Sequence, residues 1–319
     1  MKISARWKPD LSLNTWLRIG AGVAIVLAFL AHEAEWVQYR FVQQMELFAY
    51  DTRLRQFMPR TPDPRVVILD IDEKSLNAEG RWPWSRNKLA VMVRQLFDNY
   101  KVKVVGFDVA FAEPDPSSGL ATLEALGRGE RRDDAEYQAW LAKARETLDY
   151  DRLFAEEIGK YPVVLGFFLS GKTDRAGELP LPIFVEKALG DANWEFMHSL
   201  ATGYSGNIEQ LQKQATAAGH LYPALDRDGI TRRVPVFMKY GEGYYEALSF
   251  AIVRTYLGNA APKIRVIPPD PGAGNLATIP WVEAGPIRIP LDERMNALVP
   301  YRGAQGIFRY ISATDVIHG

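Results

Sequence analysis

Residues 66–110 read VVILDIDEKSLNAEGRWPWSRNKLAVMVRQLFDNYKVKVVGFDVA, and this stretch determines the fold class. It begins and ends, at 66–72 and 102–110, in runs of β-branched and apolar residues that are typical of buried strands. Between the two runs, apolar residues recur at helical spacing over residues 87–99. The stretch therefore predicts a strand, a helix and a second strand, with the two strands parallel.

The chain beyond this stretch extends the alternation. A charged helical pattern over residues 133–158 leads into a third apolar strand at 163–169. Glycine and proline turns separate the later strands, which are expected to be antiparallel or mixed. We expect an α/β fold: a three-layer domain with a parallel strand-helix-strand core and mixed or antiparallel additions, in which helices cover a largely buried sheet. The later strands are predicted at 230–238, 264–267, 276–282, 287–291 and 297–301, and a further helix at 247–257.

The N-terminal region has the pattern of a membrane anchor. Residues 19–31, IGAGVAIVLAFLA, are apolar apart from glycine, and Trp16 and Trp36 flank them as interfacial anchors do. Basic residues precede the run and acidic residues follow it, so the positive-inside rule places the N-terminus in the cytoplasm. The sequence predicts a cytoplasmic segment at 1–15 and one transmembrane helix at 16–36, with the remainder outside. A cleaved signal peptide and a buried core helix are the alternatives.

The helix is expected to continue past the membrane as a stalk over residues 37–58. The prolines of PRTPDP, residues 59–64, end it because proline lacks the amide donor that a helix needs. The stalk is either an amphipathic helix packed on its own domain or a dimerising coiled coil. A single folded domain is predicted from 59 to 319. One face of the stalk carries apolar residues at spacings of four, four and three: Val37, Phe41, Met45 and Phe48.

The composition excludes several classes of function. With 319 residues, 47% of them hydrophobic, the chain can bury one large core or two modest ones. A formal net charge of -1, without a basic stripe, argues against a nucleic-acid partner. The absence of cysteine excludes disulfides, thiolate zinc sites and cysteine nucleophiles. The four histidines are scattered, and neither G-x-S-x-G nor H-E-x-x-H occurs, so no catalytic domain, metal site or cofactor is expected.

Three short motifs have a structural explanation. GFFLSGKT at 166–173 matches a phosphate-loop expression, but its apolar residues finish a strand and no helix can begin after it. Ser85 and Lys88 have the S-x-x-K spacing of penicillin-recognising enzymes, yet their partner motifs are absent and Ser85 stands at a predicted helix N-cap. DRDG at 226–229 is too short for a calcium loop and predicts a hairpin turn with charged flanks.

A candidate ligand site follows from the predicted sheet. Ligands of open α/β sheets bind outside the carboxyl ends of parallel strands, and carboxylates follow both predicted strands of the 66–110 stretch. With the arginines and tryptophans of the connecting loop, they could hold a cation, an amine or a polar small molecule. The structural alternative is that the carboxylates cap helices or pair with arginines, while the tryptophans cover the sheet edge. The candidate residues are Asp70, Asp72, Glu73, Arg81, Trp82, Trp84, Arg86, Asp108, Glu113 and Asp115.

Seven segments of the chain carry a family resemblance. They are YDTRLR at 50–55, VVILDIDEKSL at 66–76, GRWPWSR at 80–86, VVGFDVAFAEPD at 104–115, DRDGITRRVPVFM at 226–238, YRG at 301–303 and YISATDVIHG at 310–319. Together, in this order, they resemble the type-2 CHASE domain over about residues 40–319. That family is an extracytoplasmic sensory module of cyclases and histidine kinases.

The resemblance implies a receptor. The N-terminus would be cytoplasmic, one helix would cross the inner (plasma) membrane, and the sensor domain would lie in the periplasm or outside the cell. Family members usually continue with three more transmembrane helices and a cytoplasmic adenylate or guanylate cyclase, or else a histidine or serine/threonine kinase. Cyclase sites form between two protomers, so a homodimer is expected, together with an unknown small-molecule or ionic signal.

The end of the chain departs from the family pattern. Members continue past the position of Gly319 with a further strand and a glycine-rich turn, so the sensor domain is expected to be truncated there and to lack its output domain. A membrane-anchored periplasmic scaffold or hydrolase is the alternative function from another class.

Overall fold

The structure is a computed structural model of the chain, and it describes residues 13–34, 36–37, 39–185, 187, 199–267 and 279–319. These residues form two compact units. Unit 1 contains the described residues up to Pro62 together with Tyr301–Ile307, and unit 2 contains the described residues of 63–300 and 308–319. Most of the predicted cytoplasmic segment 1–15, and the first three residues of the strand predicted at 276–282, lie outside the described residues.

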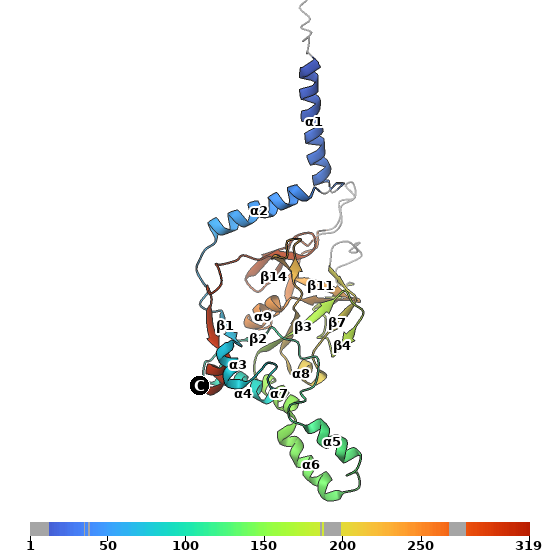
Figure 1. Cartoon of the computed structure of the whole chain (residues 1–319), viewed down its shortest axis with the longest axis vertical. Helices are drawn as coiled ribbons and strands as arrows, with labels where there is room; N and C mark the ends of the chain where they lie inside the picture. The colour runs from blue at the N-terminus through green and yellow to red at the C-terminus, as the bar shows by residue number, and fades with distance from the viewer. Residues whose placement is uncertain (1–12, 35, 38, 186, 188–198, 268–278) are drawn as a thin grey trace, which may run out of the picture. The chain divides into compact units, whose positions relative to one another are not determined.

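Unit 1 contains two helices, α1 (Leu13–Glu33) and α2 (Arg40–Phe57), drawn in blue in Figure 1. The prediction of one continuous helix through residue 36 is wrong, because the backbone unwinds after α1: Trp36 and Val37 both donate to the carbonyl of Ala31. The ring of His32 then occupies the turn, where its Nδ1 lies 3.2 Å from both the carbonyl oxygen of Val37 and the amide of Tyr39. The predicted end of α2 before Pro59 is confirmed.

Unit 2 has the mixed α/β class that the sequence predicts, but its strands form several small sheets instead of one largely buried sheet. Its helices are α3 (Glu73–Glu79), α4 (Arg86–Asp98), α5 (Leu120–Arg128), α6 (Ala135–Leu148), α7 (Tyr150–Ile158), α8 (Glu209–Gln214), α9 (Leu248–Tyr256) and α10 (Ala313–His318). Its longer strands are β1 (Val67–Asp70), β3 (Val163–Ser170), β8 (Ala217–His220), β10 (Thr231–Pro235), β11 (Phe237–Tyr240), β12 (Gly243–Glu246), β14 (Trp281–Ala284), β15 (Ile287–Pro290) and β17 (Arg309–Ser312). The shorter strands are β2 (Val105–Phe107), β4 (Arg175–Ala176), β5 (Phe184–Val185), β6 (Ser199–Ala201), β7 (Gly203–Ser205), β9 (Ala224–Leu225), β13 (Pro262–Ile264) and β16 (Asn296–Leu298).

The central strands β2, β3 and β8 run parallel, with Val105 opposite Val163 and Val164 opposite Ala217. Side chains on one face of β3, among them Val163 and Leu165, join the larger hydrophobic core with residues of α4 and α7. Helix α9 packs against the same strands, and Ile252 comes so close to Gly106 that a β-carbon there would lie 2.2 Å from its Cδ1. Three helices, α4, α7 and α9, therefore pack on this small sheet.

The predicted pairing of the first two strands is wrong. Strand β1 pairs in parallel with β17, with Val67 opposite Arg309, whereas β2 pairs with β3. The three predicted elements are present as β1, α4 and β2, and the short helix α3 lies between β1 and α4. Apolar runs identify a strand but not its partner, because every residue except proline offers the same backbone donor and acceptor.

A second hydrophobic core lies among β11, β12, β14 and α9, so the described residues bury two cores. The antiparallel order β13-β14-β15 confirms the prediction for that region. The single strand predicted at 230–238 is two strands, because Val236 turns its backbone amide to Met295 and accepts from Ala247. Strand β10 then pairs with β9 and β16, while β11 pairs with β6 and β12.

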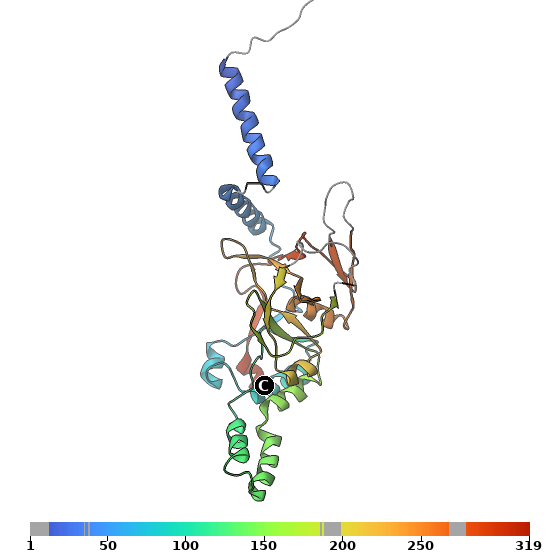
Figure 2. The same ribbon diagram turned by 90° about the vertical axis from the view of Figure 1, so that its right-hand side faces the viewer.

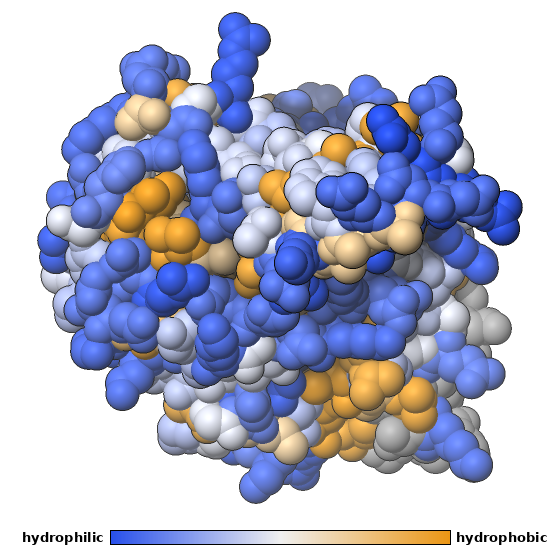
Figure 3. Space-filling view, turned by 90° about the horizontal axis from the view of Figure 1, so that it is seen from below, coloured by the Kyte–Doolittle hydropathy of each residue, from blue (hydrophilic) through white to orange (hydrophobic). Residues whose placement is uncertain are grey.

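The charged helix predicted over 133–158 is divided into α6 and α7 by Asp149, whose carboxylate caps α7 by accepting from the amide of Arg152. Helices α5 and α6 form a hairpin that projects from the rest of unit 2 in both views (Figures 1 and 2). Seen from below Figure 1, the surface is largely hydrophilic, and its apolar residues gather in a few separate patches (Figure 3).

Candidate functional site

A buried ion cluster lies at the N-terminus of α4. Arg86 begins this helix, and its Nε lies 3.6 Å from Oδ1 of Asp151, with only 11% and 10% of the two side chains exposed. The backbone amide of Arg86 donates to Oδ2 of Asp115 at 2.6 Å, and the amide of Asp115 donates to Oδ2 of Asp151 at 2.8 Å. Asp115 therefore caps α4 from a loop 29 residues further along the chain. We call Arg86, Asp115 and Asp151 the α4 cluster.

The electrostatics of the α4 cluster follow from its burial. Burial lowers the pKa of the Arg86 guanidinium, while the charges of Asp151 and Asp115 oppose the shift. Burial raises the pKa of the Asp151 carboxyl, and the hydrogen bond from the Asp115 amide opposes it. The guanidinium carbon of Arg86 also lies 4.4 Å from the centre of the Phe111 ring, a cation–π distance. Arg86 Nε and Asp151 Oδ1 have no hydrogen-bond partner among the described residues, so the attraction between these two atoms is purely electrostatic.

A second cluster joins α3 to the C-terminal strand and helix. Asp72 caps α3 by accepting from the amide of Ser75 at 2.9 Å, and its other oxygen accepts from the hydroxyl of Ser312. The hydrogen bond from Ser312 is the main reason that the pKa of Asp72 lies below its usual range. The buried hydroxyl of Ser75 in turn accepts from the backbone amide of Thr314, at 3.1 Å.

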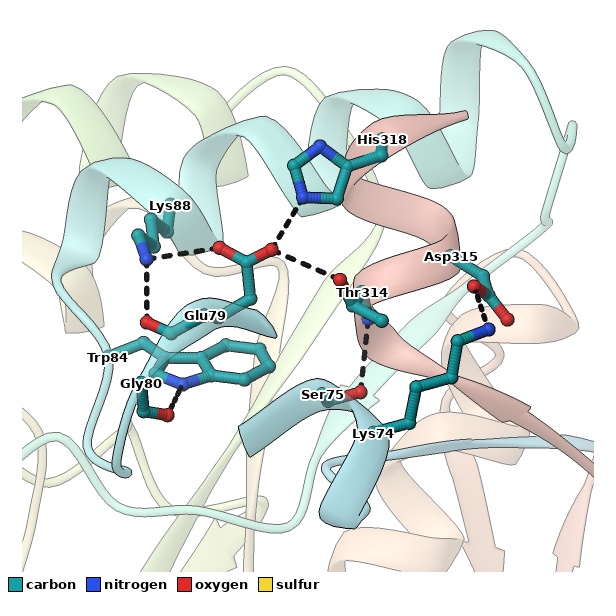
Figure 4. Close-up of polar contacts among 9 residues, drawn as sticks. All are labelled: Lys74, Ser75, Glu79, Gly80, Trp84, Lys88, Thr314, Asp315 and His318. Carbon is teal, nitrogen blue, oxygen red and sulfur yellow. Dashed lines mark hydrogen bonds and ion pairs between the residues drawn. The ribbon is translucent and has the colours of Figure 1, made fainter. Parts of the chain in front are cut away.

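Glu79, at the end of α3, is the centre of this second cluster (Figure 4). Lys88 of α4 donates to Oε2 of Glu79 at 3.0 Å, and Thr314 donates to Oε1 at 3.0 Å. Nε2 of His318 lies 2.6 Å from the same Oε1. The pKa of Glu79 is lowered chiefly by the bond from Lys88, although burial opposes that shift. We call Asp72, Glu79 and their partners the α10 cluster, because it attaches α10 to α3 and α4.

The structure does not bring the ten predicted site residues together at one place. Arg86 and Asp115 meet in the α4 cluster, where the exposed Glu113 contributes only its backbone carbonyl, 3.4 Å from Nη2 of Arg86. Asp72 belongs to the α10 cluster. Among the described residues, no hydrogen bond or ion pair joins the carboxylates after β1 to those after β2.

The remaining candidates differ in burial. Trp84 is buried in the core and donates from its indole nitrogen to the carbonyl of Gly80 at 2.8 Å, and half-buried Trp82 contacts it edge to face. Glu73, Arg81 and Asp108 are exposed. Asp70 is half buried at the end of β1, opposite Ser312 of β17. Asp72 and Asp115 cap helices and Arg86 pairs with Asp151, as the structural alternative expects, whereas Trp84 lies in the core instead of covering a sheet edge.

The described part of unit 2 contains two hollows, and Asp108 is the one predicted site residue that lines either of them. The larger, of about 600 Å³, is lined by the 178–183 segment and α8, and includes the buried pair Glu246 and Arg254, joined by two bonds of 2.7 and 2.9 Å. Burial raises the pKa of Glu246. The smaller hollow, of about 330 Å³, includes Asp108 and the buried His220, whose pKa burial lowers to about 3.

Sequence reasoning missed Asp151, Glu246, Arg254 and His220. Asp151 lies in a helical pattern rich in charge, and nothing in such a pattern marks one carboxylate as buried. The pair Glu246 and Arg254 spans the end of β12 and α9, eight residues apart, so neither strand nor helix periodicity relates the two. A charged residue within an otherwise apolar run is the one signal that could have identified Arg254.

The short motifs behave as predicted. Residues 166–170 of the phosphate-loop match lie in β3, and Lys88 bonds to Glu79 instead of Ser85. Ser85 is the N-cap residue of α4, although its hydroxyl bonds to Asn87 and the capping is done by Asp115.

The DRDG segment forms the predicted turn between β9 and β10. Its carboxylates Asp226 and Asp228 both bond to the buried Arg232, at 2.8 Å each, and this lowers the pKa of Asp228 to about 2. No group of three or more potential metal ligands occurs in the part of the chain that the structure describes.

Helix α1 has the length and composition of a membrane span or of a signal sequence, and none of Leu13–His32 is buried. Compared with known protein families, residues 21–318 match the family model described as the CHASE2 domain. No curated protein and no solved structure matches the chain.

Proposed function

The chain belongs to the CHASE2 domain family, and from this premise we propose that it is the extracytoplasmic, signal-sensing region of a transmembrane receptor. Helix α1 anchors it in the inner (plasma) membrane with the N-terminus in the cytoplasm. Unit 2, in the periplasm or outside the cell, senses a small-molecule or ionic signal. The output domain lies outside residues 1–319 and is an adenylate or guanylate cyclase, and the receptor works as a homodimer.

The observation that carries this proposal is the family match over nearly the whole chain, 21–318, which includes most of α1 as well as unit 2. An apolar helix of 21 residues is about 30 Å long, the thickness of the hydrocarbon layer. Its exposed side chains include Val23, Ile25 and Leu27, each more than half exposed, and such a surface is stable in lipid and unfavourable in water.

For the signal, the exposed members of the predicted site remain the proposed ligand residues. Asp108 supports this, because it is exposed and lines the smaller hollow. Calorimetric titration of the chain with Mg²⁺, Ca²⁺ and small amines is the test, with Asp108→Ala as the variant. Binding that the substitution abolishes supports the site, and unchanged affinity excludes Asp108 from it.

Membrane topology provides the decisive test. It can be measured by labelling single introduced cysteines, because the chain has no cysteine of its own. We expect Arg81→Cys, on an exposed loop of unit 2, to react with a membrane-impermeant maleimide in intact cells. Ser4→Cys, on the N-terminal side of α1, should react only after permeabilisation. The reverse labelling pattern would contradict the receptor proposal.

The output is tested on the full-length receptor. Formation of cyclic AMP or cyclic GMP by a dimer is the expected result. Phosphoryl transfer would instead identify a histidine or serine/threonine kinase receptor, and an active monomer would contradict the dimeric cyclase.

A further inference from the structure

Helix α2 carries an apolar surface that has no partner in the described part of unit 1. Phe41, Met45 and Phe48 are 71%, 50% and 66% exposed, and their spacing of four and three residues places them on one helical face. The opposite face, with Leu47 and Leu54, is partly shielded. We call Phe41, Met45 and Phe48 the α2 stripe.

The chain turns sharply between the two helices of unit 1. Only six residues separate the end of α1 at Glu33 from the start of α2 at Arg40, and α2 leaves α1 at a steep angle in Figure 1. Trp36 lies in this turn and is 83% exposed. A helix that leaves a membrane-spanning helix at a steep angle runs along the membrane surface, and an exposed tryptophan at that level is typical of the interface.

Charged residues flank the α2 stripe. At about 100° per residue, Arg40 and Arg53 lie roughly 100° to 120° away from Phe41, on opposite sides of it. Both arginines are exposed. Long cationic side chains in these positions can reach lipid phosphates while the apolar stripe between them enters the acyl boundary.

From these features we propose that α2 lies in the headgroup region of the bilayer that α1 crosses, with the α2 stripe facing the acyl chains. The inference rests on the proposed function, because it takes α1 to be the anchor. The stripe is about 10 Å long, two turns, whereas a coiled coil needs its apolar seam over three or four heptads. The next positions along the stripe are Thr52 and Arg55, which end it. A lipid surface therefore fits the stripe better than a second copy of the chain.

The test uses the full chain in vesicles of phosphatidylcholine and phosphatidylglycerol that contain nitroxide-labelled lipid. Phe48→Cys carries an environment-sensitive fluorophore on the stripe, and Glu46→Cys, about 140° away from Phe41, is the matched control on the same exposed helix. We expect the nitroxide lipid to quench the label at 48 at least threefold more strongly than the label at 46. Equal quenching would overturn the inference, and so would disulfide formation between two Phe48→Cys copies, which would make a second chain the occupant.

A third label separates this inference from the proposed function. Gly22→Cys lies in the middle of α1 and should be quenched by nitroxides placed deep in the acyl region. If the label at 22 is quenched and that at 48 is not, α1 spans the bilayer and only the position of α2 is wrong. If the label at 22 is not quenched, the anchor fails and both proposals fall.

Discussion

Removing the side chain of Arg86 should destabilise unit 2 severely, because Asp151 would remain buried without its ion-pair partner. Breaking a buried pair by deleting one member costs about 3 to 5 kcal/mol. The Nε–Oδ1 separation of 3.6 Å is longer than a hydrogen bond, so the lower value of about 3 kcal/mol applies to Arg86→Ala. In a domain of this size each kcal/mol lowers Tm by about 2 to 4 °C, so a decrease of roughly 6 to 12 °C is expected.

The assay is urea unfolding of the full chain in detergent micelles at pH 7, followed by tryptophan fluorescence. Arg81→Ala is the matched control, because this arginine is exposed on the loop that leads to α4, and its substitution should change the free energy of unfolding by less than about 0.5 kcal/mol. The double variant Arg86→Met with Asp151→Asn removes both charges and keeps an acceptor for the Asp115 amide. It should recover at least half of the loss.

Two results would refute this reasoning about the α4 cluster. One is an Arg86→Ala protein as stable as Arg81→Ala. The other is a double variant no more stable than Arg86→Ala, because the loss could then not come from an unpaired carboxylate at 151.

Three further outcomes are expected. Burial depresses the pKa of His220 from 6.5 to about 3, so the stability that neutral His220 contributes is present above pH 6.5 and is lost as the pH falls toward 3. Between pH 7 and 5 about 2 kcal/mol of the decrease in the free energy of unfolding should be absent in His220→Asn. Parallel curves of stability against pH for the two proteins would contradict this. Gly219→Ala places a β-carbon 2.4 Å from Cα of Leu248 and should lower the free energy of unfolding in urea by about 1 to 3 kcal/mol. The control Gly171→Ala, whose β-carbon would have no atom within 4 Å, should leave it unchanged. Equal effects of the two substitutions would exclude the close approach of β8 and α9. Glu79→Gln weakens the α10 cluster by about 1 to 2 kcal/mol, so amide hydrogen exchange in α10 should accelerate about 5- to 30-fold. Unchanged exchange would show that other contacts hold α10 in place.

Local patterns predicted most of the elements. The apolar run at 66–72 is β1 with its flanking residues, and the helical pattern at 87–99 is α4, displaced by one residue. These predictions succeeded because side-chain periodicity reports directly which face of an element is buried. The break in the helix predicted over 133–158 was missed, since Asp149 is one of several acidic residues there and only its capping bond to Arg152 distinguishes it.

The candidate site was predictable only in part. The carboxylates were correctly located after strands, but the expected convergence depended on β1 lying beside β2. With β17 beside β1 instead, Asp72 bonds to Ser312, and Asp115 bonds to the N-terminus of α4. The sequence placed Arg86 among the candidate ligand residues, whereas its burial against Asp151 makes it part of the α4 cluster.

The sequence by itself determined the apolar N-terminal helix, the α/β class and the family, because composition, periodicity and ordered motifs are properties of neighbouring residues. Only the tertiary structure decided that β1 pairs with β17, whose residues are about 240 positions away, and that Glu79 meets His318. Backbone hydrogen-bonding groups are alike in every strand, and a carboxylate has no preference for one cation over another until folding brings them together. The partners of strands and charges are therefore set by the packing of the whole domain.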